Sequence, residues 1–66
     1  MIVEINGLAV DIPENTTIKD LISLEKEGDP DLIVEHNGIF VYPRTYHEHK
    51  LFPGDKIEFI NPNLGG

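Results

Sequence analysis

Two Asn-Gly pairs constrain the fold of this chain more than any other feature of its sequence. Asn6-Gly7 and Asn37-Gly38 each supply two successive residues that tolerate a positive φ, as a type I′ turn requires. Around the first pair, residues on one face recur at period two, which is typical of strands with one buried face. The second pair also lies between two runs that suit strands. The flanking runs are residues 1–6, 8–12, 32–36 and 39–42. The sequence therefore predicts two β-hairpins.

A single amphipathic helix is predicted between the two hairpins. Thr17 suits the N-cap position, and Asp20 lies three residues later, as in a shortened capping box. The apolar residues that follow recur at helical spacing. Gly28 can adopt the left-handed conformation that ends a helix, and Pro30 prevents its continuation. We therefore expect a helix from Ile18 to Glu27.

An irregular stretch follows the second hairpin. Pro43 ends the preceding strand because it cannot donate a hydrogen bond to the ladder. Residues 44–52 have no regular pattern apart from one short turn around Tyr46–Glu48. We expect Tyr46 and Phe52 to anchor this stretch over the end of the core.

A final strand completes the predicted fold. Pro53-Gly54-Asp55 is a tight turn, and Lys56–Ile60 alternates in polarity after it. Five strands and one helix predict an α+β domain over residues 1–60, followed by a tail over residues 61–66. One helix covers only one face of such a sheet, so the other face is partly open. The acidic residues expected opposite the apolar set are Glu4, Asp11 and Glu58. Whether the last strand lies at an edge or in the middle is not settled by the pattern.

Size and charge exclude several classes of function. A chain of 66 residues buries about 60% of its unfolded surface, so we expect a module that a larger protein acts upon rather than an enzyme. It has no cysteine, which excludes a side-chain thiol as nucleophile, sulfur carrier or metal ligand. The net charge of −7 opposes nucleic-acid binding. The apolar runs are far shorter than the roughly 20 residues of a membrane span, and we expect a monomeric cytosolic protein.

The C-terminal Gly65-Gly66 is the most informative functional feature. Two residues without Cβ atoms can pass through a narrow channel. The Gly66 carboxylate is unreactive until one oxygen becomes a leaving group; adenylation would achieve this, and a sulfur nucleophile would then give a thiocarboxylate. Pro62 stiffens the free tail and lowers the entropy cost of ordering it in a partner. A frayed or truncated end is the alternative interpretation.

Phe40 and Tyr42 must point to the same side of their strand. With Ile2 and Ile60 they would form an apolar patch on the open face of the sheet, where a partner would dock. Packing within the core is the alternative. Arg44 either pairs with a local acid or contacts the partner, and the sequence does not separate the two.

The histidines raise the question of a metal site, because His47-Glu48-His49 is a compact group of donors. A zinc site requires three or four ligands in a fixed geometry. This group lies in an irregular acidic stretch, so we expect His36, His47 and His49 to be solvated loop residues and no metal to be bound. No catalytic nucleophile–base spacing or glycine-rich phosphate loop is present.

Motifs along nearly the whole chain occur in a characteristic order. They are Thr17-Ile18-Lys19-Asp20-Leu21-Ile22, Asn37-Gly38, Val41, Pro43-Arg44, Tyr46, Leu51, Gly54-Asp55, Ile57-Glu58-Phe59 and Gly65-Gly66. In this order they resemble the ThiS/MoaD type of ubiquitin-like sulfur carrier, and the length is nearer to the thiamine carriers than to the longer molybdopterin carriers. The resemblance implies a β-grasp fold, a mixed five-stranded sheet with one main helix on one face. It also implies that the last strand is central and parallel to the first.

The same resemblance implies a function. An E1-like adenylyltransferase of the ThiF/MoeB type would use ATP to adenylate Gly66. The resulting thiocarboxylate would deliver sulfur to a thiazole synthase of the ThiG type or to another sulfur-accepting enzyme, and the carrier itself would bind no cofactor. Besides Gly65, the residues expected to contact these partners are Asn63, Leu64, Pro62, Ile60, Phe40, Tyr42 and Arg44.

Three alternatives to a thiamine carrier stay open. Related carriers serve molybdopterin, cysteine, homocysteine or tRNA thiolation. A ubiquitin-like modifier would share the adenylated Gly66 but would form isopeptide bonds with lysines. A β-grasp binding module would share the pattern of Leu51, Gly54-Asp55 and Ile57 without needing a free Gly-Gly end.

Overall fold

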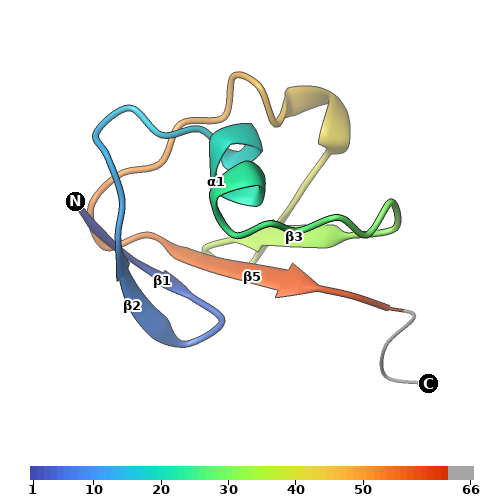
Figure 1. The fold of residues 1–66 in the computed structure, drawn as a ribbon, viewed down its shortest axis with the longest axis horizontal. Coiled ribbons are helices and arrows are strands. Elements are labelled where there is room, and N and C mark those ends of the chain that lie inside the picture. The colour runs from blue at the N-terminus through green and yellow to red at the C-terminus, as the bar shows by residue number, and fades with distance from the viewer. Residues whose placement is uncertain (63–66) are drawn as a thin grey trace.

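The computed structural model describes residues 1–62, which form a mixed five-stranded sheet with a helix on one face (Figure 1). The strand order is β2-β1-β5-β3-β4. The elements are β1 (Ile2–Ile5), β2 (Leu8–Asp11), α1 (Ile18–Leu24), β3 (Ile33–His36), β4 (Ile39–Val41), the 3-10 helix η1 (Pro43–Thr45) and β5 (Lys56–Ile60). The division into a domain over residues 1–60 and a tail over 61–66 stays a prediction, because residues 63–66 lie outside the described part of the chain.

Both predicted hairpins are confirmed. β1 pairs antiparallel with β2, and β3 pairs antiparallel with β4. In the first turn φ is 48° at Asn6 and 83° at Gly7. In the second it is 51° at Asn37 and 82° at Gly38. Both central residues of each turn therefore have the positive φ of a type I′ turn, whose twist matches that of the flanking strands.

The last strand lies in the middle of the sheet. β5 runs parallel to β1 and antiparallel to β3, which confirms the position that the family resemblance implies. Its two neighbours come from different hairpins. β5 therefore joins two separate hairpins into one sheet.

The asparagines of the two turns extend this pairing with their side chains. The Asn6 side chain accepts a hydrogen bond from the Phe59 amide at 2.7 Å and donates one to the Phe59 carbonyl at 3.3 Å. The Asn37 side chain accepts from the Lys56 amide at 2.8 Å, and its backbone amide donates to the Lys56 carbonyl at 2.7 Å. Unpaired backbone groups destabilise a fold, so each asparagine supplies partners to β5 where its neighbouring strand has ended.

The core lies between α1 and the face of the sheet beneath it (Figure 1). Its buried side chains are Val3, Ile5, Ile12, Ile18, Leu21, Val34, Val41, Leu51, Ile57 and Phe59. On β1 and β5 the buried positions alternate with exposed ones. This is the pattern of a sheet packed on one side only.

The predicted start of the helix is confirmed. The Asp20 amide donates to the Thr17 hydroxyl at 3.1 Å, and the Thr17 amide donates to the Asp20 carboxylate at 3.1 Å. This reciprocal pair is a capping box, and it satisfies amides that no helical carbonyl can reach. The same hydrogen bonds lower the pKa of Asp20 below its ordinary value.

The predicted end of the helix is wrong. α1 ends at Leu24 rather than Glu27, and the left-handed residue is Lys26, with φ of 55°, rather than Gly28. The Lys26 amide donates to the Ser23 carbonyl at 3.1 Å, and the Glu27 amide donates to the Ile22 carbonyl at 3.0 Å, which is a Schellman ending. A third turn would bury no apolar side chain, so nothing stabilises it. No helix within residues 1–62 is long and apolar enough to cross a membrane.

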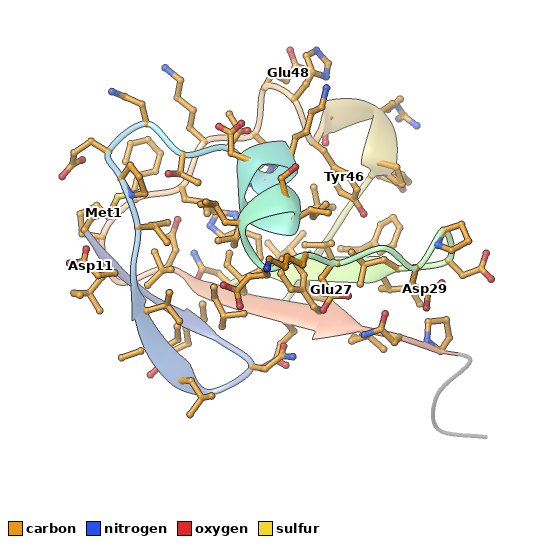
Figure 2. All side chains as sticks on the ribbon, viewed as in Figure 1. Met1, Asp11, Glu27, Asp29, Tyr46 and Glu48 are labelled. Atoms are coloured by element: carbon orange, nitrogen blue, oxygen red, sulfur yellow. The ribbon has the colours of Figure 1, made fainter. Side chains whose placement is uncertain are left out.

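Part of the stretch after β4 forms the 3-10 helix η1, which lies directly before the turn predicted around Tyr46–Glu48. Tyr46 packs against the core and lies beside α1 in Figure 2, as predicted. Phe52 is 63% exposed, so its predicted anchoring role is wrong. Leu51 takes the buried position instead, and Phe52 begins the tight turn whose closing hydrogen bond runs from the Asp55 amide to the Phe52 carbonyl at 3.1 Å.

The side chain of Asn6 should contribute measurably to stability. We expect Asn6→Gly to lower the free energy of unfolding by about 1–2 kcal/mol, because Phe59 loses two partners while glycine still tolerates the positive φ. Asn15→Gly is the matched control: Asn15 also has a positive φ, 64°, but its side chain forms no hydrogen bond within residues 1–62. Urea unfolding measures both variants. Equal losses in the two would contradict a special role for the Asn6 side chain.

Candidate functional site

Alternation along the strands places a second set of side chains on the face of the sheet that α1 does not cover. Val34 and Phe59 are directly opposite each other in β3 and β5 and are buried in the core. Ile33 and Ile60 form the neighbouring pair, so their side chains point to the open face. The acidic residues predicted for this face, Glu4, Asp11 and Glu58, are exposed.

An aromatic and a cationic side chain continue this apolar surface across β4. Phe40 and Tyr42 contact each other edge to face, with ring centroids 4.9 Å apart and planes at 87°. The Arg44 guanidinium lies 4.6 Å from the centre of the Tyr42 ring, a cation–π contact rather than the ion pair that sequence left possible. The exposed fractions are 46% for Phe40, 54% for Tyr42 and 39% for Ile60, which leaves contact area for a partner. We call Ile33, Ile60, Phe40 and Tyr42 the apolar patch.

Ile2 does not belong to the apolar patch, contrary to prediction. The parallel register of β1 and β5 places Glu4 opposite Lys56, so Ile2 lies beside the turn that precedes β5. The hydrogen bond from the Gly54 amide to the Ile2 carbonyl, at 2.8 Å, confirms this position. Ile60 lies at the other end of β5. Ile33 takes the predicted place of Ile2, and alternation along β3 was the available signal for it.

Two glutamates adjoin the apolar patch. Glu35 in β3 is directly opposite Glu58 in β5 on one side and Phe40 in β4 on the other. Like charges in directly opposed positions repel each other. Within residues 1–62 the ion pairs are Met1–Asp11 and His36–Asp55, so neither glutamate forms an ion pair in this part of the chain. The open face therefore presents a carboxylate pair beside exposed apolar area.

β5 continues into the tail at the edge of the apolar patch. After Ile60, Asn61 is half-buried and Pro62 is exposed. In Figure 1 the end of β5 points away from the body of the domain. A partner on the apolar patch would therefore also reach the start of the tail. The other predicted site residues, Asn63, Leu64, Gly65 and Gly66, lie outside the described residues.

Two of the histidines are half-buried and contact each other, so they are not the solvated loop residues that were predicted. The Nε2 atom of His36 lies 2.7 Å from the Asp55 carboxylate, and its Nδ1 atom lies 2.7 Å from Nε2 of His49. These contacts form because the stretch before β5 lies against the end of β3. No periodic pattern in the sequence predicts that these two segments meet. His47 is exposed, as predicted. Among residues 1–62, no group of three or more such donors is arranged to hold a metal ion.

A hollow of about 650 Å³ lies on the helix side of the sheet. Its walls include Lys19, Ile22, Leu32, Arg44, Tyr46 and His47. The Tyr46 hydroxyl is buried without a hydrogen-bond partner in residues 1–62, and burial raises the pKa of Tyr46. No nucleophile and base in this wall are hydrogen-bonded to each other within that part of the chain. We therefore place the candidate site on the open face.

Comparison with known proteins agrees with the architecture. A family model described as the ThiS family matches residues 2–66. Among solved structures, the chain is similar to the crystal structure of a thiamine biosynthesis protein (ThiS) from Geobacter metallireducens, with 24% sequence identity, a TM-score of 0.83 and 91% of each chain covered. No curated protein sequence matches. The predicted β-grasp fold is confirmed by this structural similarity.

The apolar patch should be dispensable for folding. We expect Phe40→Ala to lower the free energy of unfolding by only about 1 kcal/mol, because its ring is half exposed and loses mainly the contact with Tyr42. Phe59→Ala, the same change in the core, should cost about 3–5 kcal/mol. Chemical denaturation compares the two. A Phe40→Ala loss as large as that of Phe59→Ala would make Phe40 a structural residue and remove the case for a docking surface.

Proposed function

This chain belongs to the ThiS family, and we propose that it is a sulfur carrier of thiamine biosynthesis whose sulfur is attached at Gly66. The observation that carries this proposal is the extent of the family match, which covers residues 2–66 and so includes the terminal Gly65-Gly66. The similar protein from Geobacter metallireducens is described as a thiamine biosynthesis protein, which supports the choice of pathway.

The chemistry begins with activation of the Gly66 carboxylate. A carboxylate oxygen attacks the α-phosphorus of ATP, pyrophosphate leaves, and an acyl adenylate forms. A hydrosulfide ion then attacks the carbonyl carbon, the C–O bond to AMP breaks, AMP leaves, and a C–S bond forms with loss of the proton on sulfur. The resulting thiocarboxylate is the sulfur donor. Because the chain has no cysteine, the sulfur is held by the main-chain terminus rather than by a thiol.

In this proposal the chain is a carrier and its partners are the catalysts. An E1-like adenylyltransferase of the ThiF/MoeB type binds ATP and activates Gly66, and a thiazole synthase of the ThiG type accepts the sulfur. The carrier binds no cofactor of its own. Its contribution is to present its terminus at a defined distance from a surface that the partner recognises.

The geometry of β5 supports this division of labour. Ordering a free tail costs on the order of 1–2 kcal/mol per residue, so docking elsewhere must offset that cost. The apolar patch includes Ile60, the last residue of β5, and therefore adjoins the root of the tail. Pro62 restricts the backbone of the free tail and reduces the entropy lost on binding. A partner that covers the patch would hold the root while Gly65-Gly66 enters its active site.

The charges on the open face indicate what the partner surface contains. Burying Glu35 and Glu58 under an apolar partner would leave two desolvated carboxylates unpaired. A lysine or, better, an arginine between them would remove that cost and lie against the Phe40 ring. We therefore propose that the activating enzyme presents a basic side chain beside an apolar one. Arg44, stacked on Tyr42, is placed to pair with an acid at the rim of the same interface.

The width of the tail should be critical for activation. We expect Gly65→Val to reduce formation of the Gly66 adenylate by about 100-fold or more, because a branched side chain cannot pass a channel shaped for glycine and misplaces the carboxylate. ATP–pyrophosphate exchange with the cognate activating enzyme measures this step, and unfolding by urea should be unchanged.

The matched control for that variant is Gly28→Val. Gly28 has no positive φ, and nothing lies within 4 Å of a Cβ added there, so this variant should be activated normally. Normal activation of Gly65→Val would remove the tail from the proposed mechanism. Higher-mass conjugates on lysines, in place of a thiocarboxylate, would indicate a protein modifier instead.

Charge on the open face should control association with the activating enzyme. We expect Glu58→Lys to slow association by about tenfold at low ionic strength and by much less in high salt, because exposed charges steer encounters and salt screens them. Glu14→Lys makes the same change in net charge on the helix side of the sheet and is the control. Surface plasmon resonance gives both rates. Equal slowing by the two variants would show that net charge, rather than the docking face, is responsible.

A further inference from the structure

A hydrogen-bonded chain of three titratable side chains lies away from the root of the tail, and the proposed function does not use it. Asp55 comes from the turn before β5, His36 from the end of β3, and His49 from the stretch between η1 and β5. The contacts from Asp55 to His36 and from His36 to His49 are both 2.7 Å. The His36 and Asp55 side chains are 17% and 14% exposed. We call these three residues the histidine clasp.

Asp55 is held as the ionised acceptor of the clasp. Its carboxylate accepts hydrogen bonds from the Phe52 amide at 2.8 Å and the Asn37 side chain at 3.2 Å, in addition to His36. Burial alone would raise the pKa of Asp55, but these hydrogen bonds outweigh it and hold the pKa below its usual value. An ionised carboxylate only accepts, so the Nε2 atom of His36 carries the hydrogen and donates.

The contact between the two imidazoles accommodates only one hydrogen. Nδ1 of His36 and Nε2 of His49 face each other at 2.7 Å, so one must donate and the other must accept. With both rings neutral, His49 donates to His36. After one proton is added to the pair, whichever ring is protonated donates to the neutral one. The ionised Asp55 carboxylate lies next to His36, at the end of the hydrogen-bonded chain. The clasp is therefore intact with both rings neutral and with one ring protonated.

A second proton breaks this arrangement. When both rings are protonated, an N–H group of His36 faces an N–H group of His49, the hydrogen bond is lost, and two positive charges adjoin. The charged and titratable groups that face His49 are His36 from β3 and Asp55 from the turn before β5. From α1, the Ile18 amide bonds the His49 backbone carbonyl and carries no charge. One carboxylate cannot neutralise two imidazolium rings at this separation.

His49 belongs to the segment that packs on the start of α1. The His49 carbonyl accepts a hydrogen bond from the Ile18 amide at 2.9 Å, and the Leu51 amide donates to the Thr16 carbonyl at 2.9 Å. Between these contacts, Lys50 forms an isolated β-bridge with Thr17. Displacement of the His49 ring therefore acts directly on the contact between residues 49–51 and the helix start.

We propose that the histidine clasp is an acid-sensitive fastening that releases residues 46–52 from the start of α1 when both imidazoles are protonated. The sheet and the root of the tail stay in place, because Ile60 is at the other end of β5 from Asp55. Burial and the neighbouring His36 charge lower the pKa of His49, and Asp55 acts in the opposite direction. A histidine with a lowered pKa stabilises the fold above the ordinary value of 6.5, and this contribution is lost as the pH falls below it.

Amide hydrogen exchange tests the clasp directly. In the wild type, after correction for intrinsic rates, we expect exchange at Ile18 and Leu51 to rise about tenfold between about pH 7.5 and about pH 5, because the stabilisation that depends on neutral His49 is lost over this range. The Val34 amide in the sheet should not change. In His49→Gln the rise should disappear, because the glutamine amide can donate to His36 and does not titrate. His47→Gln, in the same stretch but exposed, should behave as the wild type.

A second measurement needs no variant. In an NMR titration of the wild-type protein, the His49 ring should titrate below the ordinary histidine value of 6.5, because burial and the neighbouring His36 lower its pKa. The proposal is overturned if His49→Gln retains the rise in exchange, if exchange at the Val34 amide rises as much as at Ile18 and Leu51, or if the His49 ring titrates at or above 6.5. None of these outcomes bears on activation of Gly66, so the clasp and the carrier role are tested separately.

Discussion

The insertion of β5 between two hairpins is the constraint on which the rest of the structure depends. An isolated two-stranded hairpin is marginally stable in water, and neither hairpin here could bury its apolar face alone. β5 gives hydrogen-bond partners to β1 and β3, and its Ile57 and Phe59 fill the core beneath α1. Asn6 and Asn37 fix the strand from its two sides. Because β5 ends where the tail begins, the strand that completes the sheet also attaches the tail to the centre of the domain.

Local rules predict most of this fold. The Asn-Gly pairs predict both turns because few other dipeptides tolerate two successive positive φ values. Thr17 and Asp20 predict the start of α1 for a similar reason, since capping depends on neighbours in sequence. The end of α1 is not predicted, because several residues can adopt the left-handed conformation and burial decides which one does. The rule favours Gly28, but the apolar face is exhausted after two turns, so the chain turns at Lys26.

The candidate site depends more on tertiary structure. Alternation is enough to place Phe40 with Tyr42, but the order and direction of strands decide whether distant residues meet. Parallel pairing carries Ile2 away from Ile60, and antiparallel pairing brings Ile33 to it. The histidine clasp escapes sequence analysis for the same reason, since it joins three segments that only the fold brings together. The terminal Gly65-Gly66 can be recognised from the sequence alone, because the chemistry proposed for it does not depend on the fold.

Whether Gly66 carries sulfur is decided by the intact mass of the protein isolated from its own cells without added thiols, followed by mapping of any mass difference to a residue. The carrier proposal requires a species heavier by the difference between sulfur and oxygen, located at Gly66 rather than at an oxidised Met1, which an alkylating reagent converts to a still heavier adduct. It is contradicted if Gly66 keeps a free carboxylate even after incubation with ATP, a sulfur donor and the cognate activating enzyme. That result would leave a β-grasp domain that binds partners through its open face and transfers nothing.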